Sequence, residues 1–160
     1  GNTPQTGVIV PGWRTAPGSV GALAGTLNPA VEFSGRAWMS GYSGSYIATA
    51  QASFTSQTVD ARIEAGTTYT LSFLAGIGSN GSSYFPAVQL LAAPDLTTFA
   101  RVGSPGVTLL GQMPFVSIGP EEFGEMRRYS FSVTTPAVLP PSLSSHFLAV
   151  AFVGSDGIPR

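Results

Sequence analysis

The sequence contains no cysteine, and only 9% of its residues are charged. Without cysteine the chain has no thiol nucleophile, no thiolate metal site and no disulfide. Lysine is absent as well, so the seven basic residues are all arginines, against eight acidic residues. Only Arg127 and Arg128 are adjacent. Nucleic-acid binding needs clustered cations that displace counterions from phosphates, so this composition argues against that function.

Long apolar runs are also missing. The longest one, Phe147 to Val153, is far shorter than the ~18 residues needed to cross a bilayer, so we expect no membrane span. A hydrophobic content of 43% with few charges argues against disorder. The length of 160 residues suits one buried core, and no domain boundary is visible, so we expect a single domain over residues 1–160.

Helix signals are scarce because 20 Gly and 13 Pro interrupt the chain, and the uninterrupted segments alternate with period two instead. Three segments place apolar residues on one face and polar residues on the other: Thr68 to Ala75, Arg127 to Thr135 and Gln57 to Ile63, the last with Val59, Ala61 and Ile63 inward. Two others, Ala87 to Ala93 and Phe147 to Val153, are apolar on both faces and predict central strands covered on both sides.

Weaker patterns predict further strands, at Gly7 to Val10, Val20 to Ala24, Tyr46 to Phe54 and Phe99 to Val102. About eight strands separated by turn residues, with little or no helix, predict an all-β fold. Its expected form is a two-sheet antiparallel β-sandwich of the jelly-roll kind.

Two connections are informative. Glu64-Ala65-Gly66 predicts a tight hairpin in which Gly66 adopts a positive φ. The stretch from Gly103 to Gly124 is rich in glycine and proline but also carries many apolar residues. We therefore expect it to be a loop packed down over a sheet, since a solvated loop has no need of those side chains.

Several short blocks form a series that resembles a known family. They are Pro11-Gly12-Trp13, Leu27-Asn28-Pro29, Ser56-Gln57-Thr58-Val59, Glu64 to Phe73 (EAGTTYTLSF) and Ala87 to Ala92 (AVQLLA). The series is similar to the galactose-binding-like jelly rolls of secreted bacterial surface proteins of the PEP-CTERM type, which are related to carbohydrate-binding modules. The resemblance implies a secreted or cell-surface bacterial protein that binds carbohydrate or a cell-surface or matrix polymer. The lack of cysteine and lysine fits that location.

The same pattern also occurs in calcium-dependent cyclases that rearrange indole-terpenoid substrates, so the resemblance admits an enzyme. Family members of both kinds end in a strand of the type Phe-Asp-(Asn or Asp)-Val, whereas the sequence stops at Ile158-Pro159-Arg160. If the chain is cut short there, one core strand and an acidic site residue are either missing or supplied by another chain, and the incomplete C-terminal edge is then a place where the domain could form an oligomer.

The residues themselves offer little for catalysis. A single histidine, His146, excludes multi-histidine metal sites and sits where a strand-edge histidine would make ordinary hydrogen bonds. No Gly-x-Ser-x-Gly elbow supports a Ser-His-Asp triad. The acidic group Glu121, Glu122 and Glu125 lies in a Gly/Pro-flanked segment next to Arg127 and Arg128, and predicts a solvated acidic turn balanced by these arginines. We expect no catalytic residues of these types.

Calcium needs six to eight oxygen ligands, many of which can be backbone carbonyls, so few acids suffice. The resemblance implies a structural calcium where N-terminal and C-terminal segments meet. Glu32 and Asp156 are the candidate ligands, and ordinary surface carboxylates are the alternative interpretation.

Aromatic residues are the remaining candidates for a binding site, because sugars commonly stack their apolar face on a flat ring. Those in loop-like or strand-edge positions are Trp13, Trp38, Tyr42, Tyr46 and Tyr84. For Trp13 and Trp38, packing into one end of the sandwich is an equal alternative. The hypotheses are thus an extracytoplasmic binding or adhesion module for carbohydrate, a structural surface or matrix domain without a small ligand, and a calcium-dependent cyclase-like or hydrolytic enzyme.

Overall fold

The computed structural model describes residues 5–6, 12–15, 23–27, 47–51, 54–75, 87–113 and 127–153. Within these ranges all regular structure is strand and none is helix, which confirms the all-β prediction. The strands are β1 (Gln5–Thr6), β2 (Arg14–Thr15), β3 (Leu23–Leu27), β4 (Ile47–Gln51), β5 (Phe54–Arg62), β6 (Thr68–Ala75), β7 (Ala87–Ala93), β8 (Thr108–Met113), β9 (Arg127–Thr134) and β10 (Phe147–Val153).

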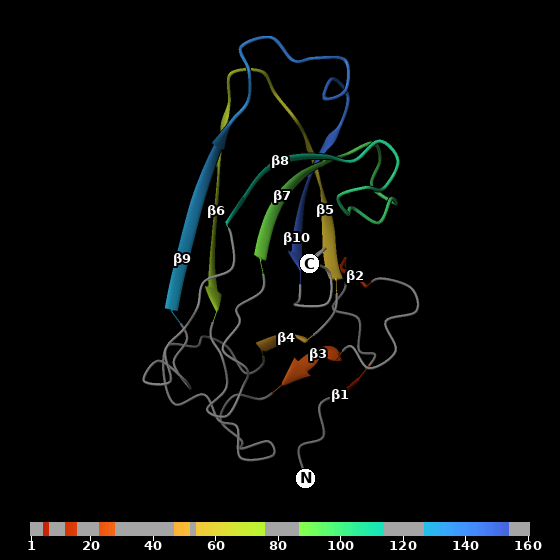
Figure 1. Cartoon of the computed structure of the whole chain (residues 1–160), viewed down its shortest axis with the longest axis vertical. Coiled ribbons are helices and arrows are strands. Elements are labelled where there is room, and N and C mark those ends of the chain that lie inside the picture. The colour runs from red at the N-terminus through yellow and green to blue at the C-terminus, as the bar shows by residue number, and fades with distance from the viewer. Residues whose placement is uncertain are drawn as a thin grey trace.

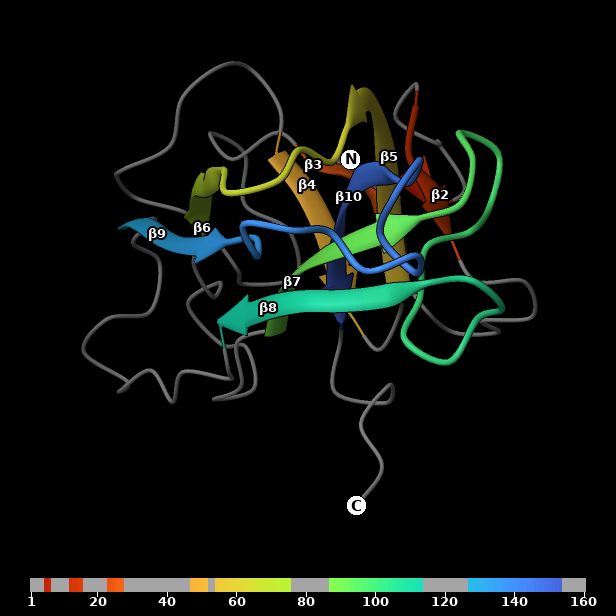
Figure 2. The same cartoon turned by 90° about the horizontal axis from the view of Figure 1, so that it is seen from above.

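Two antiparallel sheets form the sandwich that the sequence predicts. The larger has the order β2-β5-β10-β7-β8, and the smaller is the pair β6-β9. Figure 1 shows the pair beside the larger sheet, and the view from above in Figure 2 shows it set to one side of that sheet. A third, small sheet has the order β1-β3-β4.

The central strands β7 and β10 are covered on both faces, as predicted from their continuous apolar sequences. All seven residues of β7 are buried. On one face, Ala149 and Ala151 pack with Leu91 beneath Phe99 and Val107 of the β7–β8 connection. On the opposite face, Val88 packs against side chains of the smaller sheet, among them Leu71, Phe73 and Phe131. One face is thus covered by a connection and the other by the second sheet.

The smaller sheet keeps the predicted alternation. In β9 the burial alternates between exposed and half-buried side chains from Arg128 to Thr134, and β6 alternates in the same way from Thr68 to Phe73. The two layers approach closely where β8 passes β9. A Cβ added at Gly111 would lie 2.5 Å from Val133 Cγ2, so the approach requires glycine at this position.

One predicted strand is wrong, and one predicted covering loop is only partly right. Phe99 to Val102 forms no strand and belongs to the β7–β8 connection. The stretch from Gly103 to Gly124 is not simply a loop, because it contains β8 at the edge of the larger sheet. In the antiparallel register of β7 and β8, Gln89 Nε2 donates to Gln112 Oε1 at 3.1 Å. Some of the apolar residues predicted to lie in a covering loop therefore belong to a strand of the larger sheet.

The alternation predicted for Gln57 to Ile63 holds only in part. Ile63 is buried, but Ala61 is exposed rather than inward. The cause is a bulge, since Phe147 pairs with Arg62 whereas Ala149 pairs with Thr58. Extra residues in β5 between these pairs interrupt the period of two. Of the weaker predictions, Gly7 to Val10 lies outside the described residues, Val20 to Ala24 overlaps β3, and Tyr46 to Phe54 contains β4.

The predicted hairpin at Glu64-Ala65-Gly66 is instead a crossover between sheets. Gly66 does have a positive φ of 60°, but β5 pairs with β2 and β10 whereas β6 pairs with β9. The connection from β9 to β10 makes the reverse crossing at the same end, which is uppermost in Figure 1. The antiparallel pair β5–β10 therefore continues into the pair β6–β9, as in a jelly roll.

Thr135, immediately after β9, ties the two crossings together. Its side chain is 4% exposed. The hydroxyl donates to the carbonyl of Glu64 at 2.6 Å and accepts from the backbone N–H of Thr67 at 3.0 Å. The backbone N–H of Thr135 donates to the carbonyl of Thr67 at 3.0 Å. Thr135, in the β9–β10 crossing, thus provides hydrogen-bond partners for backbone groups of Glu64 and Thr67 in the β5–β6 crossing. Polar groups that are partly buried without such partners would cost free energy.

We expect Thr135→Val to lower the free energy of unfolding by about 1–3 kcal/mol, because the substitution leaves the partly buried N–H of Thr67 and carbonyl of Glu64 without their partner. Urea unfolding followed by circular dichroism measures the loss. Thr134→Val is the matched control, since the neighbouring side chain is exposed and its replacement should change stability by less than about 0.5 kcal/mol. Equal effects of the two substitutions would contradict a special role for Thr135.

Candidate functional site

Of the site residues predicted from the sequence, only Trp13 lies within the described part of the chain. The other aromatic candidates, Trp38, Tyr42, Tyr46 and Tyr84, and both calcium candidates, Glu32 and Asp156, lie outside it. The structure therefore neither brings these residues together nor separates them. Their proposed roles remain predictions.

Trp13 packs against the interior of the sandwich. Its ring centroid lies 5.4 Å from that of Phe152, with the planes tilted by 36°. Phe152 meets Phe73 edge to face at 6.0 Å, and Phe73 stacks on Tyr129 at 5.9 Å. These four rings form a row from the start of β2 through β10 to the smaller sheet. Trp13 is the half-buried outer member of that row, so one side of its ring is used in packing.

We expect Trp13→Ala to lower the free energy of unfolding by about 2 kcal/mol, below the ~3–5 kcal/mol typical of fully buried aromatic rings, because Trp13 is only half-buried. Trp13→Phe should retain most of the stability, since a ring still meets Phe152. Urea unfolding of both variants gives the comparison. An unchanged stability for Trp13→Ala would show instead that the ring does not contribute to the core.

The described acidic residues do not form a metal site. No group of three or more His, Asp or Glu residues that could hold an ion occurs among the described residues. Asp95, just after β7, has a local structural role instead. Its Oδ1 accepts from the backbone N–H groups of Thr97 and Thr98, both at 2.7 Å, and from Thr97 Oγ1 at 2.8 Å. Its Oδ2 accepts from Thr98 Oγ1 at 3.0 Å.

The hydrogen bonds from Thr97, and then those from Thr98, lower the pKa of Asp95 from 3.8 to about 2. Because the folded state favours the carboxylate, these bonds stabilise the fold above pH ~4, and the stabilisation is lost as the pH falls through about 2. Asp95→Ala should therefore be less stable than the parent protein at neutral pH, with a gap that closes between pH 4 and 2. Urea unfolding at a series of pH values checks this, and a gap independent of pH would contradict it.

His146 also has a structural role. Its Nε2 lies 2.9 Å from the carbonyl oxygen of Gly106 and its Nδ1 lies 3.4 Å from that of Ser144. The ring joins the crossing before β10 to the β7–β8 connection. These contacts with backbone carbonyls agree with the ordinary hydrogen bonds predicted for this histidine.

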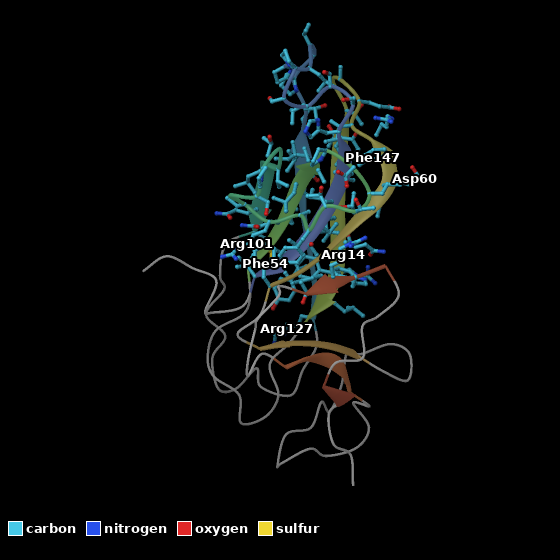
Figure 3. The ribbon with its side chains drawn as sticks, turned by 90° about the vertical axis from the view of Figure 1, so that its right-hand side faces the viewer. Arg14, Phe54, Asp60, Arg101, Arg127 and Phe147 are labelled. Atoms are coloured by element: carbon cyan, nitrogen blue, oxygen red, sulfur yellow. The ribbon has the colours of Figure 1, made fainter. Side chains whose placement is uncertain are left out.

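Two arginines pack over aromatic rings. The guanidinium carbon of Arg62 lies 4.4 Å from the ring centroid of Phe147, and that of Arg101 lies 5.5 Å from the ring centroid of Phe54. Figure 3 shows Arg101 beside Phe54 at the lower end of the larger sheet. Both guanidinium groups thus contribute to packing as cation–π partners.

The outer face of the smaller sheet carries a regular array of hydroxyl groups, which we call the hydroxyl ladder. Its members are exposed and lie opposite one another in three rungs, Thr68 with Thr134, Thr70 with Ser132, and Ser72 with Ser130. The Oγ1 atoms of Thr68 and Thr134 are 2.8 Å apart, and Thr70 Oγ1 is 2.7 Å from Ser132 Oγ. These cross-strand hydrogen bonds align the hydroxyls in two parallel rows.

In the sequence, each half of this array is visible only as the polar face of a strand. The signal was present as Thr68-x-Thr70-x-Ser72 and Ser130-x-Ser132-x-Thr134. The two patterns lie about 60 residues apart, however, and only the β6–β9 register places them side by side. The ladder continues at one end into Leu74 and Arg128, which pair with each other on the same face.

Comparison with protein-family models, with curated proteins and with solved structures finds no match to this chain. None of the described residues belongs to a helix that is long and apolar enough to span a membrane.

Proposed function

We propose that this protein is an extracytoplasmic carbohydrate-binding module and that a polysaccharide lies along the hydroxyl ladder. The observation that carries the proposal is the ladder itself, a set of exposed and aligned hydroxyls. Each hydroxyl can both donate and accept a hydrogen bond. It can therefore pair with the hydroxyls of a sugar, which also act as donors and acceptors.

The hydrogen bonds within the rungs support recognition rather than preventing it. A pair of hydroxyls contains two hydrogens, of which one is used between the partners, so the pair Thr70–Ser132 keeps one hydrogen and several lone pairs for a ligand. The internal bond also restricts the side-chain rotamers. Less rotational entropy is then lost when a ligand binds.

The shape of the face suits a polymer more than a single sugar. Arg128 and Thr134 are six residues apart on β9, which corresponds to roughly 20 Å of extended strand. Hydroxyls at every second position from Ser130 to Thr134 offer repeated contacts along roughly 14 Å of that length. Individually weak hydrogen bonds can then add up over several sugar rings.

A secreted or cell-surface bacterial location accompanies this proposal, supported by the composition and by the resemblance described above. A structural calcium ion bound through Glu32 and Asp156 is a separate expectation of the same resemblance. A structural surface domain without a small ligand is the alternative, and an enzyme is less favoured because the described histidine and Asp95 have structural hydrogen-bond partners.

Removing the middle rung tests the proposed binding face. We expect the double substitution Thr70→Val and Ser132→Ala to weaken binding about tenfold, because lost hydrogen bonds contribute about 0.5–1.5 kcal/mol each. A glycan array identifies the polysaccharides that the parent protein binds, and affinity electrophoresis with those polymers gives the change. Stability should alter little, since both partners of an exposed bond are removed together.

Ser144→Ala is the matched control, because Ser144 is an exposed hydroxyl in the crossing before β10 and does not belong to the ladder. It should leave binding unchanged. The proposal fails if the parent protein binds no polysaccharide on the array, an outcome that favours a purely structural domain. It also fails if the double variant binds as well as the parent.

A further inference from the structure

The positively charged side chain of Arg128 lies at one end of the hydroxyl ladder. Arg128 lies two residues before Ser130 on β9, so the alternation of the strand places both on the same outer face. Its side chain is exposed, and its cross-strand partner is the half-buried and uncharged Leu74. Neither the ladder residues nor Leu74 carries a carboxylate, so the described residues of this face provide no counter-charge.

The described carboxylates lie elsewhere. Asp60 is in the bulged part of β5 in the larger sheet, and the carboxylate of Asp95 accepts the hydrogen bonds of Thr97 and Thr98. Glu64 lies in the crossing that precedes β6, beyond the opposite end of the ladder. Six residues of extended strand, roughly 20 Å, separate Arg128 from that end. This exceeds the Debye length of about 8 Å at physiological salt, so Glu64 does little to neutralise Arg128.

Arginine is the side chain best suited to hold an oxyanion on such a face. Its planar guanidinium presents paired N–H donors that match a carboxylate or sulfate group, whereas an ammonium group acts as a point charge. Arg62 and Arg101, by contrast, lie over aromatic rings of the larger sheet. Among these three exposed arginines, Arg128 is the one whose strand position continues an array of hydroxyls.

We infer that the polysaccharide bound on the hydroxyl ladder is acidic and that Arg128 binds its carboxylate or sulfate groups; this inference rests on the proposed function. The hydroxyls of the ladder contact the hydroxyls of the sugar rings. The guanidinium of Arg128 binds the carboxylate or sulfate of each charged sugar unit that reaches it, and so favours an acidic polymer. The half-buried Leu74 beside it provides apolar surface for the C–H face of the sugar ring.

Matched polymers that differ only in charge test the inference. Polygalacturonate is compared with its methyl ester, and dextran sulfate with dextran, by affinity electrophoresis at low and at high salt. We expect the parent protein to bind an acidic member at least about tenfold more tightly than its neutral counterpart, with the preference reduced at high salt. Preference within the first pair identifies a carboxylate ligand, and preference within the second identifies a sulfate ligand.

Arg128→Gln should remove the preference for the acidic polymer while keeping the affinity for the neutral one. Arg14→Gln is the control, because it removes the same charge from an exposed residue of β2 in the larger sheet. An equal loss in both variants would overturn the inference, since it would show a response to net charge alone. Equal binding of acidic and neutral polymers by the parent protein would overturn it as well.

The Thr70→Val and Ser132→Ala double variant separates the two proposals. It should weaken binding of acidic and neutral polymers alike, with the preference for acid retained. If it weakens binding but Arg128→Gln has no effect, the binding face stands and the role assigned to Arg128 is wrong. If it has no effect on either polymer, the ladder is not the binding face and both proposals fall.

Discussion

The buried hydroxyl of Thr135 and the backbone around it hold together the point where the chain passes from one sheet to the other. Two crossings meet there, one from β5 to β6 and the other from β9 to β10. Besides the bonds of Thr135, the N–H of Gly66 donates to the carbonyl of Pro136 at 2.8 Å and the N–H of Ile63 donates to that of His146 at 2.9 Å. Because the crossings are hydrogen-bonded to each other, the start of β6 and the end of β9 are held side by side at this point, which favours the register with Thr68 opposite Thr134.

That register determines the chemistry of both faces of the smaller sheet. With Thr68 opposite Thr134, every hydroxyl of the ladder meets a hydroxyl and Phe73 meets Tyr129 on the inner side. A shift of one residue in one strand would turn its hydroxyls towards the core and its apolar side chains towards water, so the burial of the inner face opposes such a shift. The close approach of Gly111 to Val133 further restricts how the layers can slide. The ladder is therefore held in place by packing on the side of the sheet that faces away from it.

Strands could be predicted from the sequence wherever the segment itself shows two-residue alternation or a continuous apolar run. The bounds of β6, β7 and β10 match the predicted segments, because two-residue alternation or continuous apolar character belongs to each segment alone. The incorrect predictions concern segments whose structure depends on pairing with a neighbouring strand. The exposure of Ala61 follows from a bulge against β10, and β8 is a glycine-containing strand recognisable only by its pairing with β7. The ladder was missed for the same reason, since its two halves are remote in sequence and neither is distinctive alone.

The distribution of aromatic rings explains why recognition is assigned to hydroxyls. In the described part of the chain, Trp13, Phe152, Phe73 and Tyr129 form a row that fills the space between layers, so the rings that usually support sugars contribute to the core. An outer face without rings has little apolar surface to stack against a neutral sugar, and hydrogen bonds made in competition with water add only modest net affinity. A charged contact strengthens such a face, because charge-assisted hydrogen bonds are roughly twice as strong as neutral ones. Under the proposed function, the position of Arg128 at the end of the rungs therefore favours an acidic polymer over a neutral one.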